Sequence, residues 1–132
     1  MVVASARARA VASATELQLH RAVADFLDVV LKPSAVWTTF PAGWGKLGKA
    51  TAGTLRGCGL KPGLPDIVIF FSGRCIGIEL KTVRGKVSAA QRDMFAQLSG
   101  AGIPVYLCYS VSDVDAILFK ESVPVRRYRL AA

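Results

Sequence analysis

The sequence predicts an α/β fold in which a small mixed sheet, an antiparallel hairpin plus one parallel strand, is flanked by helices. Two observations lead to this prediction. Residues 66–81 contain two short β-branched and aromatic runs around Ser72-Gly73, which is the pattern of a β-hairpin. Residues 88–109 then have the pattern of a helix followed by an apolar strand, and a strand–helix–strand order favours a crossover and a parallel pair.

Length and composition indicate one basic globular domain. The chain has 132 residues, 52% of them apolar, and its 17 Lys+Arg against 9 Asp+Glu give a net charge of +8. A surplus of this kind points to a polyanionic partner, most often nucleic acid, although a basic surface can also be inert. We assign residues 13–132 to a single domain and the Ala- and Arg-rich residues 1–12 to a frayed basic arm.

The first half of the chain predicts a helix, a strand and a loop. The helix is predicted over residues 13–31, because Ser13 and Glu16 have the spacing of a capping box and an apolar stripe follows them. Ala35–Phe40 is β-branched and aromatic, which predicts a strand. Residues 41–63 hold seven glycines, so we expect a loop or a broken segment there.

The second half predicts two more helices around one strand. Ser88 and Gln91 form another capping box, which opens a helix that Gly100 and Gly102 end. Pro104–Tyr109 is the buried parallel strand. A short helix over residues 112–120 and a basic tail complete the chain; the tail carries Arg126, Arg127 and Arg129.

Several classes of protein are disfavoured by the same sequence. Three cysteines without a CxxC pair argue against a disulfide framework, and no charge-free run has the composition of a membrane span. We therefore expect a cytoplasmic protein, encoded by a bacterium or a phage.

Gly43–Lys49 has the GxxxxGK spacing of a phosphate-binding loop, but Ala50 supplies no hydroxyl and the glycines after it make a poor helix. We expect no nucleotide cofactor.

The hairpin register brings charged residues together. If Ser72-Gly73 is the turn, Asp66 lies directly across from Glu79, and Lys81 projects to the same side. Two neighbouring carboxylates repel one another unless a cation lies between them, and all-oxygen ligands suit Mg²⁺ or Mn²⁺. Such an ion can polarise a phosphoryl oxygen and lower the pKa of a water. The alternative is an ordinary sheet edge with Lys81 paired to a carboxylate.

These residues also carry a family resemblance. Gly63–Asp66, Ile78–Lys81 and Ser88–Gln91 together resemble the PD-(D/E)xK nuclease superfamily and, more narrowly, its VRR-NUC family. The resemblance covers most of the chain and implies a restriction-endonuclease-like core, so the predicted domain is a nuclease domain. One departure is that Pro41–Gly43 lacks the amide of the Pro-Asn element that the family often has after its first strand.

The resemblance implies roles for individual residues. The implied metal ligands are the side chains of Glu16, Asp66 and Glu79 and the main-chain carbonyl of Leu80. The implied catalytic residues are Asp66, Glu79, Lys81 and Gln91. Glu16 and Gln91 each occupy the third position of a capping box, so helix capping alone also explains them. His20, one turn after Glu16, has a packing or a site role.

Basic and aromatic residues around the motif suggest how a nucleic acid would be bound. The basic residues expected to contact phosphates without reading sequence are Lys46, Lys49, Arg56, Lys61, Arg84 and Lys86. Their alternative role is solubility. Trp37 and Trp44 either stack on an unpaired base or pack in the core and loop.

We therefore expect a Mg²⁺- or Mn²⁺-dependent DNA endonuclease, with branched or junction DNA among its candidate substrates. The alternative is a non-catalytic nucleic-acid-binding module on the same fold, which the charge alone would support. A single Asp66/Glu79 pair cuts one strand at a time, so coordinated cutting of two strands needs a second copy, and we expect a homodimer.

Overall fold

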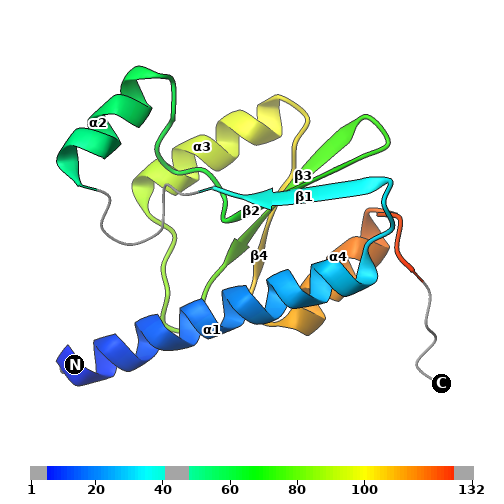
Figure 1. Cartoon of the computed structure of the whole chain (residues 1–132), viewed down its shortest axis with the longest axis horizontal. Coiled ribbons are helices and arrows are strands. Elements are labelled where there is room, and N and C mark those ends of the chain that lie inside the picture. The colour runs from blue at the N-terminus through cyan, green and yellow to red at the C-terminus, as the bar shows by residue number, and fades with distance from the viewer. Residues whose placement is uncertain (1–5, 41–47, 127–132) are drawn as a thin grey trace.

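The computed structural model describes residues 6–40 and 48–126, with side chains from residue 16 onward within these ranges. The elements are α1 (Ala6–Val30), β1 (Ala35–Thr39), α2 (Lys49–Gly57), β2 (Ile67–Phe71), β3 (Arg74–Leu80), α3 (Ala89–Gly100), β4 (Val105–Cys108) and α4 (Val111–Lys120). Figure 1 shows α1 and α4 on one side of the sheet and α3 on the other. The predictions for Pro41–Gly43, Trp44, Lys46, Arg127 and Arg129 lie outside the described residues.

The sheet confirms the predicted mixed topology. Its order is β1-β2-β3-β4; the first two pairings are antiparallel and β3 pairs with β4 in parallel. The hairpin turn is Ser72-Gly73, with φ values of 49° and 70°. Positive φ at both positions is typical of a two-residue turn that matches strand twist. The register from Phe71 opposite Arg74 to Ile67 opposite Ile78 is the predicted one.

The core lies between the sheet and the α1–α4 layer. One face of the hairpin is apolar and buried throughout: it consists of Ile67, Ile69, Phe71, Ile76, Ile78 and Leu80. Val23 and Leu27 of α1 and Val114 and Leu118 of α4 pack against it. The opposite face is covered less completely, since Phe70 on β2 is 48% exposed.

The first helix begins earlier than predicted. α1 starts at Ala6 and continues through Ser13, so the predicted helix start at Ser13 is wrong, whereas the division of the chain into an arm and a domain stays a prediction. Alanine and arginine are among the best helix formers, so residues 6–12 can extend the helix across the capping-box pattern. Glu16 is therefore an interior helix residue and does not cap α1.

The glycine-rich segment contains a helix that the sequence analysis missed. Residues 49–57 form α2, with Gly48 at its N-cap, and the chain leaves it through Gly59 at φ +109°. The Leu60 N–H donates to the Leu55 carbonyl at 2.9 Å, the bond that closes a helix ended by a left-handed glycine. Two of the glycines thus mark helix ends. Ala50 lacks the hydroxyl of a phosphate-binding loop, and β1 before it is an antiparallel strand.

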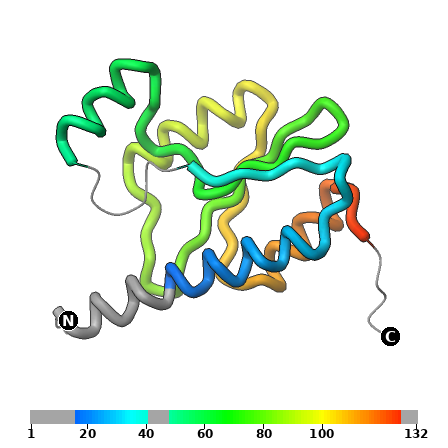
Figure 2. The backbone as a smooth tube through the Cα atoms, viewed as in Figure 1, coloured from blue at the N-terminus to red at the C-terminus, as the bar shows by residue number. Residues whose placement is uncertain are grey.

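The later elements follow the sequence closely. Ser88 caps α3, and both bonds of the predicted capping box with Gln91 are present. β4 lies within the predicted strand, and α4 begins one residue earlier than predicted, with Ser110 as its N-cap. In Figure 2 the chain leaves β3, passes through residues 81–88 and turns back to enter α3. None of the described helices is long and apolar enough to cross a membrane.

Close backbone contacts place the segment before β2. Gly63, at φ +81°, lies so close to the first turn of α3 that a Cβ there would be 2.2 Å from the Ala90 carbonyl oxygen. On the other side, a Cβ on Gly77 would be 2.9 Å from the Pro65 ring. The Gly63–Pro65 segment is therefore held between α3 and β3, and it leads directly to Asp66.

We expect Gly63→Ala to destabilise the protein more than Gly59→Ala. Both glycines have positive φ, which opposes any side chain, but only Gly63 also abuts backbone; nothing lies within 4 Å of a Cβ on Gly59. The strain at Gly59 should lower the free energy of unfolding by about 1–3 kcal/mol, and overpacking at Gly63 should add about 1–3 kcal/mol. Urea denaturation of both variants checks this; equal losses of stability would contradict the contact argument.

Candidate active site

Two carboxylates meet at the open end of the hairpin. The Leu80 N–H donates to Oδ2 of Asp66 at 2.8 Å, and the Asp66 N–H donates to Oε1 of Glu79 at 3.2 Å. Each acidic side chain is thus bound to the backbone of the neighbouring strand segment. The printed ladder ends at Ile67 opposite Ile78; extending it by one position brings Asp66 beside Glu79, as predicted, and the two bonds join them.

Glu79 is the one charged residue in the buried part of the described structure, at 1% exposure. Its Oε2 accepts a hydrogen bond from Nε2 of Gln91 at 2.6 Å and lies 3.0 Å from Nζ of Lys81. A buried carboxylate needs such partners, because leaving it unpaired is strongly unfavourable. The structure therefore brings together the four residues that the sequence analysis implied to be catalytic.

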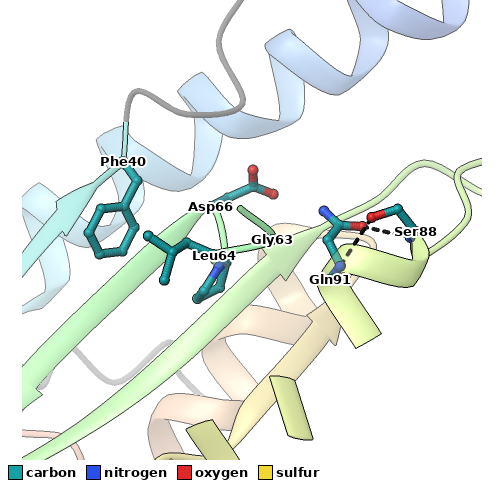
Figure 3. A pocket seen from close by; sticks show the side chains of 7 residues that line it. Phe40, Gly63, Leu64, Asp66, Ser88 and Gln91 are labelled. Carbon is teal, nitrogen blue, oxygen red and sulfur yellow. Dashed lines mark hydrogen bonds between the residues drawn. The ribbon is translucent and has the colours of Figure 1, made fainter. Parts of the chain in front are cut away.

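Gln91 combines the two roles that the sequence left open. Its Oε1 accepts from the Ser88 N–H at 2.9 Å, which is the capping-box bond, while its Nε2 donates to Glu79. Capping turns the amide so that its NH₂ group faces the carboxylate. Figure 3 shows Gln91 beside Ser88 at the start of α3, with Asp66 on the neighbouring strand segment.

Lys81 follows β3 and is largely buried. Its side chain is 12% exposed, and its Nζ forms the ion pair with Glu79. A Cβ on Gly85 would lie 3.1 Å from Cδ of Lys81, so the glycine leaves room for the lysine stem. The ammonium group is thus held beside the carboxylates, where it can also stabilise negative charge on a bound phosphate.

Burial raises the pKa of Glu79 from 4.5 to about 7, with the charge of Asp66 acting in the same direction. Lys81 opposes this rise but does not cancel it. The pair of carboxylates is thus electrostatically unfavourable near neutral pH without a compensating charge. A cation at this point would relieve both the repulsion and the desolvation.

The donor atoms fit a divalent cation. The paired register of the hairpin ends at Ile67 opposite Ile78, and beyond it the Leu80 N–H binds the Asp66 side chain. In a strand the carbonyl of a residue points to the same side as its N–H, so the Leu80 carbonyl faces the Asp66 side of β3. Two carboxylates and a main-chain carbonyl form an oxygen-only set of the kind that suits Mg²⁺ or Mn²⁺. The described residues contain no metal-binding group of three His, Cys, Asp or Glu side chains.

The two α1 residues considered for the site have different outcomes. Glu16 is partly buried, but it does not complete a three-carboxylate group with Asp66 and Glu79, and its role as a ligand stays a prediction. His20 lies one turn later, with Nε2 3.4 Å from Oγ1 of Thr39. Thr39 in turn donates to the Asp66 carbonyl at 2.7 Å. His20 is thus linked to the backbone that carries Asp66.

The predicted phosphate-contacting residues within the described chain lie on two segments. Lys49 and Arg56 are on α2 and Lys61 follows it, while Arg84 and Lys86 lie in the loop between β3 and α3. All five are exposed, and the ion pairs among the described residues, Arg74–Glu121 and Lys81–Glu79, include none of them. Their positive charge is therefore available to a partner.

The two tryptophans have different outcomes. Trp37 packs against the core, and its Nε1 donates to Oδ1 of Asp28 at 3.0 Å, so it has the packing role, whereas Trp44 lies outside the described residues.

A pocket of about 160 Å³ adjoins the site. It is lined by Phe40 and Leu64 on one side and by Asp66, Ser88 and Gln91 on the other. Figure 3 shows these side chains around it. The sequence analysis missed Phe40, whose only signal was its place at the end of an aromatic strand.

The comparisons with known proteins concern the fold and the family of the chain. A solved structure described as a VRR_NUC domain protein superposes with a TM-score of 0.55 and 16% identity, covering 79% of this chain and 84% of that chain. No curated protein matches the chain. The architecture is accordingly a restriction-endonuclease-like fold.

The family-model comparison is more specific. The family model of the VRR-NUC domain matches residues 35–112. That span is more than half of the chain and contains Asp66, Glu79, Lys81 and Gln91. The chain belongs to the VRR-NUC family, and it carries a nuclease-type domain.

Without a divalent cation, the Glu79 carboxyl should make stability fall as pH rises. Its folded pKa of about 7 exceeds its ordinary value of 4.5, so its contribution is present below pH 4.5 and is lost as pH rises to about 7. Urea denaturation in EDTA at pH 5 and pH 8 should show this loss relative to Glu79→Gln, which does not titrate. If the free energy of unfolding of the wild type changed with pH by the same amount as that of Glu79→Gln, burial of the Glu79 carboxyl would not explain the pH dependence.

Proposed function

We propose that the protein is a Mg²⁺- or Mn²⁺-dependent DNA endonuclease that hydrolyses phosphodiester bonds. The single observation that carries the proposal is the joint placement of Asp66, Glu79 and Lys81, with the Leu80 carbonyl, at one open end of the hairpin. Membership of a nuclease-type family supports the same reading.

The residues of the chain divide the work of hydrolysis. Asp66, Glu79 and the Leu80 carbonyl would hold the cation, and Gln91 orients Glu79 through its 2.6 Å bond. The cation, when bound, would polarise the phosphoryl oxygen and lower the pKa of a water. Lys81 is held within 3.0 Å of Glu79, where its ammonium can stabilise charge that develops on the phosphate.

The surface of the molecule carries a net positive charge, whereas the site is acidic, and this difference supports a nucleic acid as substrate. The net charge of +8 attracts a polyanion to the molecule, whereas the Asp66/Glu79 pair repels a phosphate locally. Lys49 stands at the N-terminus of α2, where the helix dipole disfavours a cation and no acid accompanies it. A positive charge placed against the dipole is better explained by a phosphate partner than by helix stability.

Assembly and substrate shape are further parts of the proposal. One carboxylate pair acts on one strand, so coordinated cleavage of two strands needs a second copy, which a homodimer supplies. Branched or junction DNA would meet the same exposed basic residues as linear DNA. Both statements stay predictions.

Cleavage should require the cation and Asp66. We expect wild type to cut DNA in Mg²⁺ or Mn²⁺ and to stop in excess EDTA, and Asp66→Asn to lose roughly a hundredfold or more in rate, because a ligand and a charge are removed. Asp115→Asn on the exposed side of α4 is the matched control. If Asp66→Asn binds DNA but does not cut it, the result supports the proposed endonuclease. If the wild type binds DNA without any metal-dependent cutting, the protein is a non-catalytic binding module.

Binding should weaken steeply with salt if the exposed basic residues contact phosphates. Replacing Arg84 and Lys86 together by alanine should reduce the log–log salt slope on duplex DNA by about 0.9 for each phosphate that is no longer neutralised. Lys32→Ala, exposed at the far end of α1, should leave the slope unchanged. Fluorescence anisotropy in EDTA, between low and moderate salt, measures this slope. A wild-type affinity that does not change with salt would show that the surface charge serves solubility.

A further inference from the structure

The pocket beside the carboxylates has one apolar wall and one polar wall. Phe40 and Leu64 form the apolar side, and the polar side contains Asp66 and Gln91. In Figure 3 the Phe40 ring lies on one side of Asp66 and the Gln91 amide on the other, with Leu64 between them. The pocket is therefore continuous with the site proposed to act on the phosphate.

Phe40 is tied to the site through its backbone. Its N–H donates to the Asp66 carbonyl at 3.4 Å, and the preceding Thr39 hydroxyl donates to the same oxygen at 2.7 Å. The end of β1 thus keeps the Phe40 backbone at a fixed place relative to Asp66. The Phe40 side chain is only partly buried, and it lines the pocket.

The chemistry of the lining favours a neutral flat group. None of the described residues that line the pocket is positively charged, while one is a carboxylate, so a phosphate is not its natural occupant. Its volume of about 160 Å³ is close to that of cavities that accept a single benzene ring, about 150 Å³. In a nucleic acid, the group of this size and polarity next to a phosphate is a base.

We propose that this pocket receives the base of one unpaired nucleotide adjoining the phosphate at Asp66, with that base stacked on Phe40. The inference rests on the proposed function for the position of the phosphate. A base paired within a duplex is stacked on its neighbours and cannot enter, whereas an unpaired base can. The substrate class is therefore single-stranded DNA or the unpaired nucleotides of a branch.

Binding without turnover tests the pocket directly. In EDTA, fluorescence anisotropy would compare a 15-nucleotide thymidine oligomer, a 15-base-pair duplex and an abasic deoxyribose-phosphate 15-mer. Phe40→Ala should weaken thymidine-oligomer binding roughly tenfold, as expected when a base–aromatic stack is removed, and leave the duplex and the abasic strand unchanged. Phe70→Ala removes another exposed ring, on β2 and outside the pocket, and should change none of the three.

Two further variants keep the result interpretable if Phe40→Ala does not fold. Phe40→Leu retains apolar volume without a flat face and should weaken thymidine-oligomer binding, whereas Phe40→Trp should preserve it. Equal weakening of all three ligands by Phe40→Leu, or no weakening of any, would overturn the base pocket. Weaker binding of the abasic strand and of the thymidine oligomer alike would assign the pocket to the sugar and refute the proposal.

The outcomes separate this inference from the proposed function. Selective loss of single-strand binding in a protein that never cuts DNA would support the base pocket and refute the nuclease. Metal-dependent cutting with no effect of Phe40→Leu on single-strand affinity would support the nuclease and refute the base pocket.

Discussion

The burial of one carboxylate constrains the arrangement around it. Glu79 lies inside the sheet at 1% exposure, and desolvation raises its pKa to about 7. It is tolerated because partners reach it from separate parts of the chain: the Asp66 N–H before β2, Lys81 after β3 and Gln91 in α3. The docking of α3 and the hairpin register must both be right for these bonds to form. The fold and the site are therefore specified by the same contacts.

Small and ring-closed residues supply the space that this arrangement needs. Gly63 lets the segment before β2 touch the backbone of α3, Gly77 accepts the Pro65 ring, and Gly85 makes room for the stem of Lys81. Residues without chemistry of their own thus determine which oxygen atoms converge.

Much of the fold could be predicted because it depends on local patterns. Alternating apolar residues around Ser72-Gly73 specified the hairpin and its register, and the capping box at Ser88 located the start of α3. Predictions were wrong where two local signals conflict. The helix propensity of the residues before Ser13 overrides its capping-box pattern. The glycines of residues 41–63 predict a loop, whereas Gly48 and Gly59 mark the two ends of α2.

By itself the sequence determined the opposition of Asp66 and Glu79, since a two-residue turn leaves only one register for the strands that follow it. Tertiary structure decided the rest. Gln91 caps its helix and also binds Glu79, which depends on how α3 packs on the sheet. Phe40 borders the site only because β1 pairs with β2 and ends beside Asp66. Such contacts join residues far apart in the chain, and their geometry follows from packing, which no local pattern encodes.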